Sequence, residues 1–163
     1  MTEAVLALGS NLGDRLENLR AAAAALEAGD FEITRVSSVW ETRPVPADQP
    51  AYLNAVIAGD TALDPPSLLR LAKSIEHDLG RRPGRRWGPR PIDIDILFHG
   101  TAHLETADLT IPHPRIRERA FVLVPLAEVL SGSLPVIGET ASALLTRVDV
   151  SGIRRHGPLL AER

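Results

Sequence analysis

The stretch that decides the fold is residues 86–97, which read Arg-Trp-Gly-Pro-Arg-Pro-Ile-Asp-Ile-Asp-Ile-Leu. Within residues 92–97, β-branched apolar residues alternate with acidic ones, which is the period of a β-strand. Because residues i and i+2 of a strand share a face, Asp93 and Asp95 point the same way, with Cα atoms about 6.6 Å apart at roughly 3.3 Å per residue. The isoleucines at 92, 94 and 96 share the opposite face, where they can enter a core.

Two carboxylates side by side on a rigid strand repel each other unless a cation neutralises them. A divalent metal ion does this well, and the chain contains no cysteine that could supply a thiolate ligand. Hard oxygen ligands favour Mg²⁺ over Zn²⁺, so the pair predicts a magnesium site at Asp93 and Asp95. The alternative is a half-exposed strand whose aspartates are merely solvated.

An arginine-rich segment, residues 81–90, immediately precedes the acidic strand. It contains proline and glycine but no acidic residue, which is typical of a loop. A guanidinium group presents a fork of donors that suits phosphate oxygens. Metal-binding carboxylates beside such a loop favour a bound polyphosphate, and hence phosphoryl-type transfer. The arginines are Arg81, Arg82, Arg85, Arg86 and Arg90.

Length and charge narrow the class of protein. The 163 residues carry a formal net charge of −3, whereas a general nucleic-acid binder is usually basic. No apolar run is long enough to span a membrane, and the first residues lack the pattern of a signal peptide. We expect one cytoplasmic domain over residues 1–163, a monomer that takes small-molecule substrates and has neither nucleic acid nor membrane as a partner.

The order of the expected elements predicts the fold class. Strands are expected at residues 3–9, 31–40, 52–59 and 92–97, and amphipathic helices at 14–28 and 64–79. A short hairpin partner within residues 103–110 follows, and residues 121–130 form a helix or a strand. This β-α-β-β-α-β order is typical of the ferredoxin-like α+β sandwich, an antiparallel sheet with helices packed on one face. Residues 147–163 carry little signal.

Four further features have a functional and an ordinary reading. The Gly9–Gly13 turn could cradle phosphate, but a tight connection explains it better. Asn54 shares a strand face with Tyr52 and could read a flat heterocycle, or it could be a buried amide satisfied by a loop.

Glu76 lies where a helix dipole disfavours a negative charge, although surface glutamates are common. His113 lies between two prolines and could donate to a phosphate, or be a loop histidine without a role.

Several motifs occur in unbroken order along the chain. They are AVLALGSNLG at residues 4–13, WETRP at 40–44, DQP at 48–50, YLNA at 52–55, RWGPR at 86–90, IDIDI at 92–96, IPHP at 111–114 and RAF at 119–121. In these motifs the chain resembles the 6-hydroxymethyl-7,8-dihydropterin pyrophosphokinase family, over roughly residues 4–130.

The resemblance implies that diphosphate passes from ATP to the hydroxymethyl group of the dihydropterin, with release of AMP, in folate biosynthesis. It implies that Asp93 and Asp95 hold two Mg²⁺ ions and act in catalysis together with Arg81 and Arg90. The residues that it places on the ATP side are Leu69, Lys73, Glu76, Arg81, Trp87, Arg90, Ile96, Thr110, His113 and Arg119. The residues that it places on the pterin side are Thr42, Val45, Tyr52, Asn54, Trp87, Asp95 and Phe121.

The chain departs from the family pattern in two loops. Residues 43–46 lack a glycine that is often found there, and the loop from Gly80 to Trp87 is about one residue shorter than in some members, as is usual for surface loops. The roles of Arg82 and Arg85 therefore stay unassigned.

Two other classes of function compete with this interpretation. A nucleotide- or nucleic-acid-binding module on the same fold would need exposed aromatic residues on its strands, and the chain has only three Phe, two Trp and one Tyr. A different metal-dependent nucleotidyl transferase could use the acidic pair, but it would leave the Trp87–Arg90 motif and Asn54 unexplained.

Overall fold

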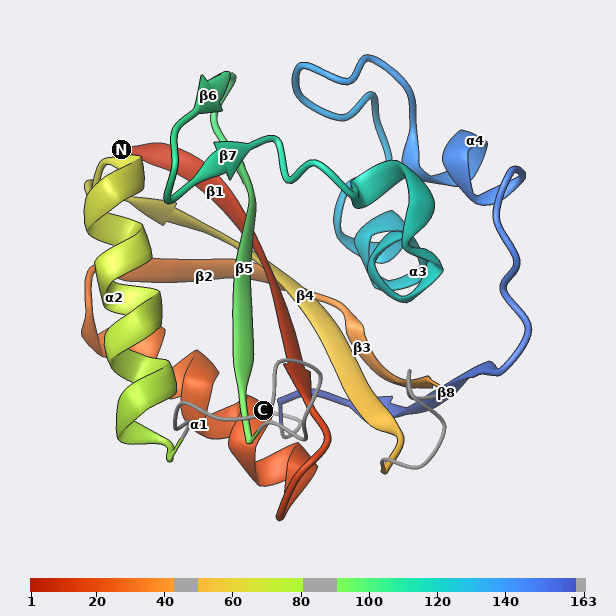
Figure 1. The fold of residues 1–163 in the computed structure, drawn as a ribbon, viewed down its shortest axis with the longest axis horizontal. Helices are drawn as coiled ribbons and strands as arrows, with labels where there is room; N and C mark the ends of the chain where they lie inside the picture. Colours follow the sequence, from red (N-terminus) through yellow and green to blue (C-terminus); the bar gives the residue numbers. More distant parts are fainter. Residues whose placement is uncertain (43–49, 81–90, 161–163) are drawn as a thin grey trace.

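A computed structural model gives the structure of residues 1–42, 50–80 and 91–160 (Figure 1). The strands are β1 (Thr2–Ser10), β2 (Phe31–Val36), β3 (Ser38–Thr42), β4 (Tyr52–Thr61), β5 (Asp93–His99), β6 (Leu104–Glu105), β7 (Thr110–Ile111) and β8 (Ile153–Pro158). The helices are α1 (Arg15–Ala28), α2 (Pro65–Asp78), α3 (Ala120–Val129) and α4 (Ala141–Leu145), with a 3₁₀ turn η1 (Ile116–Glu118).

Across the described ranges, one antiparallel sheet has the strand order β5-β1-β4-β3-β8, and β2 also pairs with β4. The central strand β1 pairs with β4 on one side and with β5 on the other. The short strands β6 and β7 form the hairpin expected before His113. The predicted antiparallel α+β class is therefore confirmed.

The strand predicted at residues 31–40 is broken, and Ser37 is the cause. Its backbone N–H donates to the Val56 carbonyl at 2.9 Å, while its hydroxyl oxygen accepts the Val56 N–H at 2.8 Å. One residue thus satisfies both backbone groups of Val56 and interrupts the regular ladder. Strand β2 pairs with the second half of β4, and β3 pairs with its first residues.

Helices α1 and α2 cover the first face of the sheet, close to their predicted bounds (Figure 1). Each starts at an aspartate cap: Asp14 accepts the Glu17 N–H at 3.2 Å, and Asp64 accepts the Ser67 N–H at 2.9 Å. Their buried side chains pack against Ala4, Leu6 and Leu8 of β1 and against Ile94 and Ile96 of β5, and together they close a core. Prominent members of this core are Leu6, Leu8, Leu19, Leu26, Leu68, Ile75, Ile92, Ile94 and Ile96.

The expectation that helices cover only one face is wrong, because α3 and α4 build a second core on the other face. Residues 121–130 are helical although Pro125 lies inside α3, and Val122, Leu123 and Leu126 are buried against Val5 and other residues of the sheet. Helix α3 packs on β4, β3 and β2, so it covers this face only in part.

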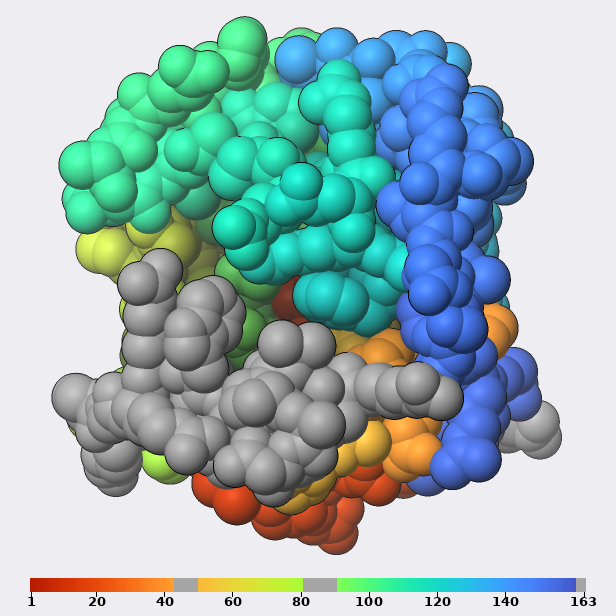
Figure 2. Space-filling view, turned by 45° about the vertical axis from the view of Figure 1, so that its right-hand side comes forward, coloured from red at the N-terminus to blue at the C-terminus, as the bar shows by residue number. Residues whose placement is uncertain are grey.

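The C-terminal strand β8, which the sequence did not predict, pairs with β3 at the edge of the sheet. In Figure 2 the C-terminal segment, coloured blue, runs down one side of the molecule beside the cyan residues of α3. Within residues 1–42, 50–80 and 91–160, no helix has the length and apolar character needed to cross a bilayer.

Candidate active site

The second face of the sheet carries the acidic pair in a row of aligned residues. In the register of β1, Gly9 lies opposite Asn54 of β4 and opposite Asp93 of β5, and Ala7 lies opposite Asp95. Residues paired across antiparallel strands share a face, so the two carboxylates and the Asn54 amide point to the same side, separated by small residues. In Figure 2 atoms of β1 (red) and β5 (green) stay visible beneath the cyan α3 segment.

The predicted repulsion within the acidic pair appears in the ionisation of Asp95. Burial and, after it, the neighbouring Asp93 carboxylate raise the pKa of Asp95 to about 6. Arg119 opposes this shift: its Nη1 lies 4.0 Å from Asp95 Oδ2. The Asp95 side chain keeps 39% of its surface exposed, so water or a ligand can reach the carboxylate.

Glu76 is not the surface glutamate that its position in the helix suggested. It is only 2% exposed, and its Oε2 accepts the Ile94 N–H at 2.8 Å, so it closes the outer edge of β5 between the two aspartates. Lys73, one turn earlier on α2, places its Nζ 3.4 Å from Glu76 Oε1. A third carboxylate and a cation therefore lie beside the acidic pair.

The start of α3 supplies a cation and an aromatic ring to the same region. The Arg119 guanidinium lies 5.6 Å from the centre of the Phe121 ring, which is within cation–π range. Phe121 is 37% exposed, which is high for a phenylalanine and leaves a face of its ring accessible. The carboxylates, a guanidinium and an exposed ring are thus brought together from β5 and α3.

The backbone of His113 is tied to strand β5, because its N–H donates to the Leu97 carbonyl at 3.1 Å. The ring Nδ1 accepts the Arg115 N–H at 3.2 Å, so in the neutral ring the proton is on Nε2. Burial, followed by the charge of Arg119, lowers the pKa of His113 to about 4. At neutral pH the ring is therefore an uncharged donor through Nε2.

On the neighbouring strands, Thr42, Asn54 and Tyr52 form a second group. The Thr42 hydroxyl donates to Asn54 Oδ1 at 2.8 Å in a buried hydrogen bond. A Cβ atom on Gly9 would lie 3.0 Å from Asn54 Nδ2 and 3.4 Å from the Tyr52 ring, so the absence of a side chain at Gly9 lets both groups lie over β1. The prediction that Asn54 and Tyr52 share a face is confirmed.

The remaining candidates are less central or lie outside the described residues. Leu69 is half-buried on α2, and Thr110 is half-buried on β7. Ile96 is 3% exposed, and its side chain belongs to the core of the first face, opposite the carboxylates. The candidates that lie outside the described residues are Val45, Arg81, Trp87 and Arg90, together with Arg82 and Arg85.

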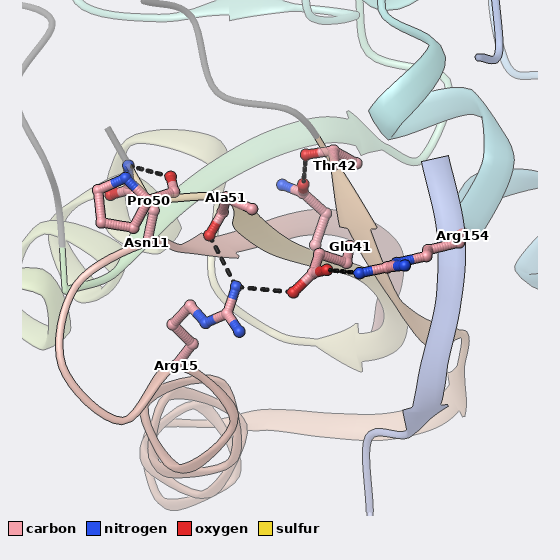
Figure 3. Close-up of polar contacts among 8 residues, drawn as sticks. Asn11, Arg15, Glu41, Thr42, Pro50, Ala51 and Arg154 are labelled. Carbon is pink, nitrogen blue, oxygen red and sulfur yellow. Dashed lines mark hydrogen bonds and ion pairs between the residues drawn. The ribbon is translucent and has the colours of Figure 1, made fainter. Parts of the chain in front are cut away.

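One polar cluster beside the site was not foreseen (Figure 3). Glu41 accepts from Arg15 at 3.0 Å and from Arg154 at 2.8 Å, and Arg15 also donates to the Ala51 carbonyl at 2.8 Å. Asn11, part of the glycine turn, donates to the Pro50 carbonyl at 3.3 Å, in keeping with the structural reading of that turn. No local pattern could reveal these contacts, since each joins distant parts of the chain.

Within the described ranges, no cluster of three or more Asp, Glu, His or Cys residues has the arrangement of a metal site. Two carboxylates on one strand would give a metal ion only part of its oxygen ligands, and a phosphate group can give the others. The acidic pair could therefore hold a divalent metal ion that takes its other oxygen ligands from a bound molecule.

Comparison with known proteins identifies the family of the chain. A family model for 7,8-dihydro-6-hydroxymethylpterin-pyrophosphokinase (HPPK) matches residues 5–131. A 2-amino-4-hydroxy-6-hydroxymethyldihydropteridine pyrophosphokinase of Methylorubrum extorquens is 46% identical over 157 residues, covering 95% of this chain and 99% of the relative.

A mitochondrial folate synthesis bifunctional protein of Arabidopsis thaliana is 47% identical over 133 residues, which is 81% of this chain. The match covers only 24% of that longer relative. In fold, the chain is similar to a crystal structure of a Plasmodium falciparum HPPK-DHPS triple mutant, with a TM-score of 0.72 at 16% identity over 90% of this chain and 43% of that one. The chain therefore belongs to the 7,8-dihydro-6-hydroxymethylpterin-pyrophosphokinase family.

Proposed function

We propose that this protein transfers diphosphate from ATP to the hydroxymethyl group of 6-hydroxymethyl-7,8-dihydropterin. The hydroxyl oxygen attacks the β-phosphorus of ATP, the bond from that phosphorus to the α–β bridging oxygen breaks, and AMP leaves while the hydroxyl proton is released. The observation that carries the proposal is the row Asp93–Gly9–Asn54, which puts the acidic pair and the Asn54 amide on one face of the sheet, with strand β1 between them.

Asp93 and Asp95 are the residues that would hold two Mg²⁺ ions. The raised pKa of Asp95, caused by burial and then by Asp93, supports a site whose negative charge Arg119 and Lys73 offset only in part. Bound magnesium would lower the pKa of the acceptor hydroxyl and neutralise charge at the β-phosphorus. The two carboxylates fix the geometry, because both project from one rigid strand.

The nucleotide would lie across β5 and the start of α3. Arg119 offers a guanidinium fork to phosphate oxygens, and His113 donates through Nε2 without adding charge. Lys73 and Glu76 lie on the α2 side of the same strand. The other residues assigned to ATP are Leu69, Ile96 and Thr110 and, outside the described residues, Arg81, Trp87 and Arg90.

The pterin would lie over β1 and β4. The Thr42 hydroxyl donates a hydrogen bond to Asn54 Oδ1 and so orients the amide, whose N–H groups would read the heterocycle. Tyr52 and Phe121 offer aromatic faces for stacking. Asp95 adjoins the acceptor hydroxyl, and Val45 and Trp87 complete the assignment from outside the described residues.

The test is an assay for AMP release from ATP and Mg²⁺, with and without the dihydropterin. AMP that forms only when the pterin is present supports the proposal. Binding of ATP without AMP release would favour a nucleotide-binding module, and AMP release that does not depend on pterin would favour another transferase. Omission of Mg²⁺ is expected to abolish the pterin-dependent product.

A further inference from the structure

The Glu41 carboxylate joins parts of the chain that are distant in sequence (Figure 3). Its Oε2 accepts from Arg15 Nη1 of α1 at 3.0 Å, and its Oε1 accepts from Arg154 Nη2 of β8 at 2.8 Å. Glu41 directly precedes Thr42 on strand β3, so its side chain projects from the opposite face of the sheet. It therefore acts from the face of the sheet opposite to Thr42 and Asn54.

Arg15 extends this contact to the neighbouring strand. The same Nη1 that reaches Glu41 also donates to the Ala51 carbonyl at 2.8 Å, directly before β4 starts at Tyr52. The last registered pair of the β3–β4 ladder is Thr42 with Tyr52. Because the ends of strands open more easily than their middles, we expect side-chain contacts at this point to affect how closely the two strands stay together.

The two arginines contribute unequally. The Arg15 and Glu41 side chains are 26% and 19% exposed, so their attraction is less screened than that of Arg154, which is 81% exposed. Arg154 lies directly opposite Glu41 in the register of β3 and β8. Its hydrogen bond is the largest cause that lowers the pKa of Glu41; burial opposes the shift and Arg15 adds to it, so the carboxylate is ionised at neutral pH.

We propose that Glu41 is a positioning residue for the pterin: by holding the end of β3 to α1 and to Ala51, it fixes Thr42 against the Asn54 amide. The inference rests on the proposed function, which assigns Thr42 and Asn54 to pterin recognition. It also gives strand β8 a role in substrate recognition through Arg154, although β8 lies beyond residues 5–131 that match the family model.

The variants that test this separate positioning from stability alone. Glu41→Gln keeps the shape but removes the charge, and Arg154→Met removes one exposed partner without disturbing a buried group. Glu139→Gln is the matched control, because Glu139 makes an ion pair of 2.8 Å with Arg147, and neither residue lies on an element that carries a candidate site residue. Arg154→Lys restores the charge that Arg154→Met removes.

Steady-state kinetics with each substrate varied in turn give the main result. We expect Glu41→Gln to raise KM for the dihydropterin about fivefold, the scale of one partly buried charge pair, with KM for ATP and kcat changed by less than about twofold. Arg154→Met should raise the pterin KM about twofold, with recovery in Arg154→Lys. Glu139→Gln should match the wild type.

A second measurement does not depend on activity. The nuclear magnetic resonance signals of the Asn54 side-chain amide should shift in Glu41→Gln and stay in place in Glu139→Gln. The positioning role is overturned if Glu41→Gln folds but leaves the Asn54 signal unmoved, or if it changes both KM values equally.

Two other outcomes are distinguishable from this one. If the wild type releases no AMP, the proposed function fails, and the Asn54 signals alone decide the inference. If Glu41→Gln does not fold, Arg154→Met decides the inference by the same two measurements.

Discussion

The two faces of strand β5 are built from alternating residues of one short segment, yet one face packs in a core and the other carries the acidic pair. On the first face Ile92, Ile94 and Ile96 are at most 3% exposed and pack under α1 and α2. On the second face the Asp95 side chain is 39% exposed and carries a pKa of about 6. The comparison shows what strand alternation makes possible. The isoleucines anchor the strand in a rigid core, and the neighbouring aspartates are thereby held in a fixed position on the other face.

The sharpest way to test this division is to remove one carboxylate. Asp95→Ala should lower turnover by about a thousandfold or more, the scale of removing a group that acts on transition-state charge, while the protein stays folded. AMP release and circular dichroism check the two parts of the prediction. An unfolded Asp95→Ala protein would show that the second face is structural as well.

The neighbouring residue on the opposite face should behave in the reverse way. Ile94→Ala should lower the free energy of unfolding by about 2–5 kcal/mol, because it opens a cavity in a closed core. Urea denaturation measures this loss, and kcat per folded molecule should change little. A large loss of kcat with unaltered stability would contradict the division between the faces.

Variants of Glu76 test the outer edge of strand β5, where its two faces meet. Glu76→Ala leaves the buried Ile94 N–H without its 2.8 Å acceptor, so we expect the free energy of unfolding to fall by about 1–3 kcal/mol. Glu76→Gln keeps an acceptor and should retain most of the stability. Equal losses in both variants would mean that the charge beside Lys73, rather than the hydrogen bond to Ile94, is what matters.

The smallest expected effect concerns pH. Because the pKa of Asp95 in the folded protein is about 6, above the 3.8 of an unperturbed aspartate, the folded state binds this proton more tightly than the unfolded state. The stability from this group is present below pH 3.8 and is lost as the pH rises through about 6.

In the absence of Mg²⁺, Asp95→Asn should therefore raise the free energy of unfolding relative to the wild type at pH 8, and not at pH 3.5. The gain should be modest, since solvent screens a side chain that is 39% exposed. Thermal unfolding at the two pH values measures it. A variant that is less stable than the wild type at pH 8 would show that the ionised carboxylate is better compensated than its surroundings indicate.

Local patterns in the sequence predicted the elements that carry the site. The alternation at residues 92–97 predicted β5 and the common face of Asp93 and Asp95, and the shared face of Tyr52 and Asn54 followed from the same rule. Helices α1 and α2 followed from apolar periodicity. These predictions succeed because each depends on neighbours a few residues apart.

Other features depended on contacts between distant residues. Ser37 breaks a strand through Val56, which is 19 positions away, and Glu76 is buried by its bond to Ile94, which is 18 positions away. Strand β8 is formed by few apolar residues and owes its place to pairing with β3. The periodicity within these segments does not indicate which distant residue each one contacts, so propensity alone could not predict these contacts.

The sequence by itself thus determined which residues alternate on β5, where the main helices begin, and that an acidic pair faces away from the isoleucines. Only the tertiary structure decided that α3 covers part of the second face, that Glu76 seals the strand edge, and that Arg15 and Arg154 meet at Glu41. The physical reason is that backbone geometry fixes side-chain direction locally, whereas burial and ion pairing depend on which distant segment packs against it.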